Sequence, residues 1–189
     1  MAPSGFVLAG GRSRRMGRDK ALLPYGGRVL VAHVAAVVEE ALGSAGRVAI
    51  LGDPDCYRDL GYPVHADLIP NCGPLGGIVT ALKLTQSDWS LVVACDMPLL
   101  SASSLRMLAE RALESQANCI AASGPAGEPE PLCALYHLRS LPALDRALRD
   151  KRLKMKDLLP ELQLESVAFP AAALANVNTP EEWTQFQPR

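Results

Sequence analysis

A glycine-rich and strongly basic segment follows the first apolar run of the chain. Residues 8–20 read Leu-Ala-Gly-Gly-Arg-Ser-Arg-Arg-Met-Gly-Arg-Asp-Lys, with three glycines and five basic side chains among thirteen residues. Glycine lets backbone N–H groups approach an anion closely, and the N-terminus of a following helix adds partial positive charge. The segment therefore predicts a polyphosphate site, in which Lys20 supplies a mobile point charge.

This segment does not match the two best-known phosphate-binding signatures. Gly10 and Gly11 are adjacent and Gly17 comes six residues later, which is not the G-x-G-x-x-G spacing of dinucleotide-binding loops. The chain contains no Gly-Lys-Ser or Gly-Lys-Thr, so a Walker A loop is excluded as well. A plain glycine turn with solvated arginines stays open as the alternative to a polyphosphate site.

A carboxylate follows a strongly apolar run later in the chain. Residues 91–98 read Leu-Val-Val-Ala-Cys-Asp-Met-Pro, and Pro98 prevents a strand from continuing. Magnesium prefers one or two carboxylates together with phosphate oxygens and water, so Asp96 is the candidate metal ligand. The alternative is that Asp96 caps the next helix, a role that Ser101 or Ser103 could equally fill.

Two further segments have side chains suited to a polar ligand. Asp67 comes shortly before a Gly-Pro turn, after which Gly76 and Gly77 leave room for a planar group. Asn176 and Asn178 are two positions apart on a segment expected to be extended, so both amides face one side. A common glycine turn before a helix and ordinary turn-forming asparagines are the alternatives.

Composition limits the classes of partner. The chain has 189 residues, a net charge of -1 and a pI near 6.3, so wholesale nucleic-acid binding is not expected. Residues 1–4 hold no basic group, and the apolar stretch after them is too short for a signal peptide or a membrane span. These features predict a cytoplasmic protein without membrane contact. Five cysteines without a C-x-x-C pair favour reduced thiols over disulfides or a zinc site.

Apolar runs of strand length alternate with segments of helical period along the chain. Strands are expected at 5–9, 47–51, 91–94, 119–122, 132–136 and 164–168, and helices at 30–45, 75–84, 103–115, 141–149 and 180 to about 186. This alternation predicts an α/β fold with three layers, α/β/α, around a mostly parallel, Rossmann-like sheet, formed by one domain over residues 1–189. Ligands of such sheets bind at the carboxyl ends of the strands, where the basic segment and Asp96 would lie.

Four of these segments together resemble a known family. The segment from Leu8 to Lys20 resembles the signature loop of nucleotidyltransferases that join a nucleoside triphosphate to a phosphorylated acceptor. Its combination with Gly73-Pro74-Leu75-x-Gly77, Cys95-Asp96-Met97-Pro98 and Asn176-Val177-Asn178-Thr179-Pro180-Glu181 resembles the molybdenum cofactor guanylyltransferases. The resemblance extends from Val7 to Trp183.

The resemblance implies an activity, a fold type and partners. The implied reaction transfers GMP from GTP to the molybdopterin-bound molybdenum cofactor, with magnesium, and releases pyrophosphate. The implied fold is that of the nucleotide-diphospho-sugar transferases, with an N-terminal GTP-binding part and a C-terminal part for the pterin substrate. Molybdenum-insertion proteins or recipient apoenzymes are the implied protein partners. A cytidylyltransferase of the same pathway and a sugar-phosphate nucleotidyltransferase share the loop and stay open as alternatives, as does a regulatory protein that has lost catalysis.

The resemblance also implies roles for individual residues. By similarity, the GTP site consists of Leu8, Ala9, Gly10, Gly11, Lys20, Asp67, Gly76, Gly77 and Asp96. The implied catalytic residues are Lys20, Asp96 and Arg15, with Asp96 as the ligand of Mg2+. Asn176 and Asn178 would meet the pterin substrate.

Overall fold

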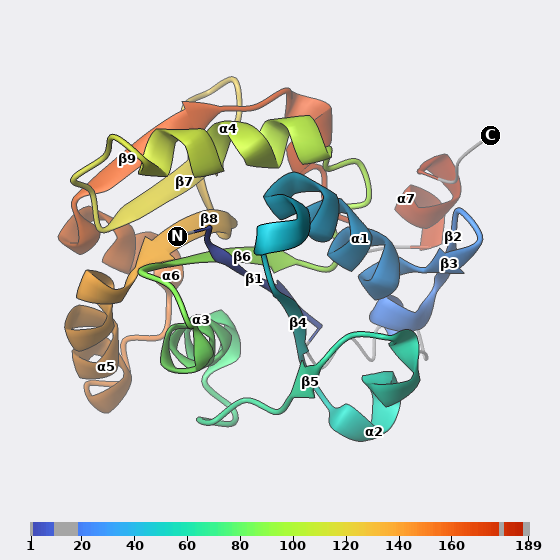
Figure 1. Cartoon of the computed structure of the whole chain (residues 1–189), viewed down its shortest axis with the longest axis horizontal. Helices are drawn as coiled ribbons and strands as arrows, with labels where there is room; N and C mark the ends of the chain where they lie inside the picture. The colour runs from blue at the N-terminus through green and yellow to red at the C-terminus, as the bar shows by residue number, and fades with distance from the viewer. Residues whose placement is uncertain (1, 10–18, 178–179, 187–189) are drawn as a thin grey trace.

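One sheet with the strand order β5-β4-β1-β6-β8-β7-β9 forms the centre of the molecule in the computed structural model (Figure 1). The structure describes residues 2–9, 19–177 and 180–186. The strands are β1 (Ser4–Leu8), β4 (Val48–Leu51), β5 (Val64–His65), β6 (Trp89–Ala94), β7 (Cys119–Ser123), β8 (Pro129–His137) and β9 (Leu164–Ala168). Neighbouring strands are parallel except where β8 pairs antiparallel with β6 and β7. The predicted mostly parallel α/β fold is confirmed.

Helices cover both faces of the sheet. One face packs against α1 (Leu30–Leu42) and α4 (Ala102–Ala112), and the other against α3 (Gly73–Leu84), beside which lies α5 (Leu141–Arg149) (Figure 1). The shorter helices are α2 (Pro54–Tyr57), α6 (Met155–Leu158) and α7 (Pro180–Gln185), and the 3-10 turns are η2 (Lys20–Leu22), η3 (Gly43–Ala45), η4 (Arg58–Leu60), η5 (Leu138–Ser140), η6 (Leu159–Leu162) and η7 (Ala171–Leu174). Within the described ranges, no helix is long and apolar enough to cross a membrane.

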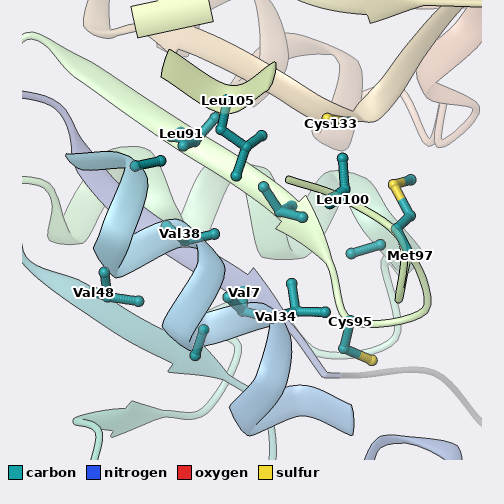
Figure 2. Packing of buried hydrophobic residues seen from close by; sticks show 14 of the residues in the cluster. Val7, Val34, Val38, Val48, Leu91, Cys95, Met97, Leu100, Leu105 and Cys133 are labelled. Carbon is teal, nitrogen blue, oxygen red and sulfur yellow. The ribbon is translucent and has the colours of Figure 1, made fainter. Parts of the chain in front are cut away.

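Strand side chains alternate between two separate cores. Val7 of β1 packs toward α1 and α4, whereas its neighbours Phe6 and Leu8 pack toward α3 on the opposite face. Figure 2 shows the first core, in which the side chains of Val34 and Val38 of α1 gather close to Val7 of β1. Because both faces of the strands are buried, the central strands are mostly apolar, as is typical of parallel sheets.

Most predicted elements occur, with corrected bounds. The predictions for α5 and β9 are confirmed to the residue. The predicted helix over 30–45 is too long, because Gly43 has a φ of +66° and ends α1 at Leu42. The predicted helix over 103–115 is shifted, since α4 covers Ala102–Ala112 and Ser101 caps it by accepting a hydrogen bond from Ser104 N.

Several short elements were not predicted. The antiparallel hairpin of β2 (Pro24–Tyr25) and β3 (Arg28–Val29) turns at two glycines with positive φ, the usual geometry of a two-residue hairpin loop. The two residues of β5 and the four of α2 are too few to show a hydrophobic period. The antiparallel direction of β8 follows from its short connection to β7, which leaves no room for a crossover helix.

The five cysteines are free thiols. Cys95, Cys119 and Cys133 are buried, and Cys56 is exposed. Burial raises the pKa of the Cys95 thiol to about 12, so this side chain stays neutral at physiological pH.

The tight packing of α1 on β1 leads to a prediction at Gly5. A Cβ atom there would lie 2.6 Å from Val38 Cγ1 and 3.0 Å from Leu42 Cδ1. We expect Gly5→Ala to lower the free energy of unfolding by about 1–3 kcal/mol, because the helix must shift outward. Urea denaturation measures the change. Gly124→Ala is the matched control, since among the described residues no atom beyond its chain neighbours lies within 4 Å of its Cβ position; equal stability of the two variants would contradict this account.

Candidate functional site

The parallel pairing of β1 with β6 brings two distant segments together at the carboxyl edge of the sheet. Leu8 is in register with Ala94, and the N–H of Cys95 donates a hydrogen bond to Leu8 O at 3.1 Å. The chain therefore leaves both strands side by side, at Ala9 and at Asp96. A cavity of about 140 Å³ opens at this point. Its lining consists of Leu8, Ala9, Asp19, Lys20, Ala21, Pro74, Ala94, Cys95, Asp96 and Leu132.

An ion pair between Lys20 and Asp96 crosses this cavity. Lys20 Nζ lies 2.8 Å from Asp96 Oδ2, and the two side chains are only 10% and 21% exposed. The other carboxylate oxygen, Asp96 Oδ1, is buried and accepts no hydrogen bond from the described residues. A buried acceptor without a donor is rare in proteins, and at a cavity it is available to a cation or another ligand.

Asp96 does not cap the following helix. The N-cap of α4 is Ser101, whose side chain accepts a hydrogen bond from Ser104 N. The alternative structural role for this carboxylate is therefore excluded, and the carboxylate faces the cavity instead.

The segment before α7 returns to the same place. The N–H of Val177 donates a hydrogen bond to the backbone oxygen of Asp96 at 2.9 Å. Asn176 Oδ1, next to it in the chain, is buried and likewise accepts no hydrogen bond from the described residues. Carboxylate and amide oxygens are ligands that magnesium accepts. In the part of the chain that the structure describes, no three or more His, Cys, Asp and Glu side chains are grouped so that they could hold a metal ion by themselves.

Asp67 lies beside the start of α3, close to Leu8 of the cavity lining. It follows β5, and a Cβ atom at Gly77 of α3 would lie 3.7 Å from Asp67 Oδ1 and 3.0 Å from Leu8 Cδ2. Because Gly77 has no side chain, Leu8 and the Asp67 carboxylate can both lie against its backbone. Desolvation by burial raises the pKa of Asp67 above its usual value.

A buried threonine fixes the segment that carries Asp67. Leu68 N–H donates to Thr80 Oγ1 at 3.0 Å, and that hydroxyl donates to Gly76 O at 2.8 Å. A Cβ atom at Gly76 would lie 2.8 Å from Ile69 O, so this helix position must be glycine for the segment to approach. The predicted residues Asp67, Gly76 and Gly77 therefore form one cluster.

Three contributors to the site were not predicted. Thr80 lies in an apolar helix, and its residue type gives no functional signal. Tyr57 ends the four-residue helix α2, and its hydroxyl lies 3.0 Å from Ala9 O and 2.5 Å from Asp19 Oδ2. Asp19 belongs to the basic segment, but the sequence does not show that its carboxylate contacts a tyrosine.

The predicted residues Gly10, Gly11, Arg15 and Asn178 lie outside the described residues.

Comparison with known proteins identifies the family. The family model of the MobA-like NTP transferase domain matches residues 5–166. The chain belongs to the MobA-like NTP transferase family. Its relatives include the molybdenum cofactor guanylyltransferase of Xanthomonas euvesicatoria, which is 36% identical over 97% of this chain and 93% of that protein. The enzyme of the same name from Shewanella frigidimarina is 32% identical over 98% of this chain and 97% of its own length.

A solved structure shows the same fold. The molybdopterin-guanine dinucleotide biosynthesis protein A of Archaeoglobus fulgidus superposes with a TM-score of 0.78 at 23% identity, over 96% of this chain and 95% of that chain. As a MobA-like NTP transferase, the chain thus has a nucleotidyltransferase fold along nearly its whole length.

The raised pKa of Asp67 predicts a gain in stability when its charge is removed. Because the folded state disfavours the ionised carboxylate, ionisation of Asp67 at neutral pH lowers the stability of the fold. This loss of stability disappears as the pH falls below the pKa that Asp67 has in the unfolded chain. We expect Asp67→Asn to melt at a higher temperature than the unsubstituted protein at pH 7, with a difference that shrinks toward pH 4. Thermal melts at several pH values test this. Asp88→Asn, at an exposed carboxylate, is the control; a lower melting temperature of Asp67→Asn at pH 7 would contradict the assignment.

Proposed function

We propose that this chain transfers GMP from GTP to the molybdopterin-bound molybdenum cofactor, forming the guanine dinucleotide cofactor and pyrophosphate. The observation that carries the proposal is the buried pair of Lys20 and Asp96 at the carboxyl ends of β1 and β6, in which Asp96 Oδ1 accepts no hydrogen bond from the described residues. The names of relatives that match along nearly the whole chain support guanine as the base and the molybdenum cofactor as the acceptor.

The nucleoside of GTP would occupy the space between β1 and α3. Leu8 and Ala9 of the cavity lining are its proposed contacts on the strand, and Asp67, Gly76 and Gly77 are those beside the start of α3. The triphosphate would extend past Ala9 to the Lys20 ammonium, with Gly10, Gly11 and Arg15 proposed as further contacts. A charged ammonium near several phosphate oxygens favours the triphosphate over a neutral nucleoside.

The residues present fit a divalent cation. Asp96 would hold it through the oxygen that accepts no hydrogen bond from the described residues, and Asn176 offers a second buried oxygen on the neighbouring segment. A Mycobacterium tuberculosis protein of the same fold, with a TM-score of 0.69 and 16% identity, is known as a manganese complex, which supports a divalent ion. We propose Mg2+ as the cofactor. When bound, it would neutralise negative charge on the phosphates.

The proposed chemistry needs positioning and charge neutralisation more than proton transfer. An oxygen of the acceptor phosphate forms a bond to the α-phosphorus of GTP, while the bond from that phosphorus to the bridging oxygen breaks and pyrophosphate leaves with its electron pair. A phosphate monoester has a second pKa of about 6, so the attacking oxygen needs no general base at neutral pH. Lys20 would move from Asp96 to the phosphate oxygens and stabilise their charge in the transition state.

The acceptor would approach from the side of the segment before α7. Asn176 and Asn178 are the proposed contacts of the pterin substrate, and the hydrogen bond from Val177 to Asp96 places this segment beside the proposed metal. Molybdenum-insertion proteins or recipient apoenzymes are the proposed partners for transfer of the finished cofactor.

Asp96→Asn tests the metal ligand. We expect this variant to fold and to form the guanine dinucleotide cofactor at least about a hundredfold more slowly, because a neutral amide binds the cation weakly. Turnover in the presence of Mg2+ is the measurement. Asp145→Asn is the matched control, because Asp145 pairs with Lys83 at 3.0 Å between α3 and α5, away from the cavity. Near-normal turnover of Asp96→Asn would remove the proposed role.

Lys20→Ala tests the phosphate contact. We expect its dissociation constant for GTP to rise at least about tenfold and its turnover to fall, because a buried charged hydrogen-bond donor is lost. Equilibrium binding of GTP and steady-state kinetics measure the two effects. Lys83→Ala removes the cation of the distant ion pair and serves as the control. If both affinity and turnover of Lys20→Ala match those of this control, the phosphate-binding interpretation is wrong.

A further inference from the structure

The hydroxyl of Tyr57 contacts both ends of the basic, glycine-rich segment. Tyr57 Oη donates a hydrogen bond to Ala9 O at 3.0 Å and lies 2.5 Å from Asp19 Oδ2. Ala9 is the last described residue before this segment, and Asp19 is the first described residue after residues 10–18. A phenol has a single proton, so the two acceptors share one donor and are held at a fixed separation from it.

The tyrosine itself is firmly held. Its side chain is buried at the end of α2, a helix that begins with Asp53 as N-cap and Pro54 in its first turn. A Cβ atom at Gly52 would lie 2.6 Å from Tyr57 Cε2 and 3.3 Å from the Cβ of Ala9. The absence of a side chain at Gly52 therefore gives the ring its place beside Ala9.

The contact continues from Asp19 to the proposed phosphate-binding lysine. Asp19 Oδ1 accepts a hydrogen bond from Ala21 N at 3.0 Å and so caps the turn η2, in which Lys20 is the first residue. Lys20 Nζ in turn pairs with Asp96. Burial and the neighbouring Asp19 carboxylate raise the pKa of Tyr57 far above physiological pH, so its hydroxyl remains a donor.

We propose that Tyr57 is a positioning residue for the triphosphate of the substrate nucleotide. Its hydroxyl sets the distance between the Ala9 backbone, on one side of the phosphates, and the turn that presents the Lys20 ammonium, on the other. This inference rests on the proposed function, because it requires a nucleoside triphosphate at these two residues. Tyr57 touches neither the substrate nor the metal in this account; it acts through Ala9 and Asp19.

The geometry separates this role from recognition of the nucleoside. Thr80 bonds to Leu68 and Gly76, the chain neighbours of the proposed nucleoside contacts Asp67 and Gly77, whereas the Tyr57 hydroxyl bonds to Ala9 and Asp19. Loss of the Tyr57 hydroxyl should therefore weaken binding of the triphosphate and leave binding of the nucleoside unchanged. A general loss of packing would weaken both.

Binding of GTP and of guanosine to the Tyr57→Phe variant tests the inference. Calorimetry in the presence of Mg2+ gives the dissociation constants for the full chain. We expect GTP to bind about tenfold more weakly, the usual effect of one lost hydrogen bond to a charged group, and guanosine to bind as before. Tyr62→Phe is the matched control, because its hydroxyl bonds to exposed Glu39 at 3.2 Å, outside the cavity. It should bind both ligands as the unsubstituted protein does.

Two results would overturn the inference: GTP affinity of Tyr57→Phe equal to that of Tyr62→Phe, or equal weakening of GTP and guanosine binding.

Should Tyr57→Phe fail to fold, Asp19→Ala removes the hydrogen-bond partner of Tyr57 and is expected to show the same selective loss of GTP affinity. Where both variants fold, the loss of GTP binding free energy in the double variant should be smaller than the sum of the two single losses, because the bond between Tyr57 and Asp19 is counted in both; fully additive losses would contradict a shared role. An unsubstituted protein that binds no nucleoside triphosphate would refute the proposed function itself; one that prefers another triphosphate still allows the test with that nucleotide.

Discussion

The register of β1 on β6 is the constraint on which the site depends. Parallel pairing with Leu8 opposite Ala94 ends both strands at the same edge and directs the chain out of the sheet at Ala9 and Asp96. This arrangement allows the ammonium of Lys20 to reach the carboxylate of Asp96. A shift of one residue would turn the alternating side chains of β1 to the wrong cores, so the packing of both faces enforces the geometry of the site.

A partly buried ion pair in a cavity is a weak source of stability. Its two charges lose hydration on folding, and their attraction returns little more than that loss. The pair of Lys20 and Asp96 is better explained by what each partner can bind. In the proposed reaction the ammonium exchanges its carboxylate for phosphate oxygens and the carboxylate exchanges its ammonium for a cation, so neither charge is left alone at any stage. The fold supports the pair from outside, through Tyr57 with Asp19 and through Val177.

Much of the fold follows from local signals in the sequence. Uninterrupted apolar runs identify the central strands, and amphipathic periods identify helices such as α5. The general rule for the carboxyl ends of parallel strands also places the basic segment near Asp96. The hairpin of β2 and β3 was missed although Gly26 and Gly27 are a local signal for it. The direction of β8 depends on tertiary pairing with β6 and β7, which no single segment shows.

The supporting contacts of the site could not be predicted in the same way. Thr80 and Tyr57 act through hydrogen bonds to backbone atoms and to side chains of distant segments, and their residue types are common in cores and short helices. The hydrogen bond from Val177, the residue after Asn176, to Asp96 likewise depends on where the chain returns after β9. The most direct measurement of the central claim is pyrophosphate release from GTP, CTP, ATP and UTP with Mg2+, each with and without the molybdopterin-bound cofactor. We predict release from GTP only when the molybdenum cofactor is present. Release from GTP with a sugar phosphate as acceptor, or from CTP in preference to GTP, would contradict the account.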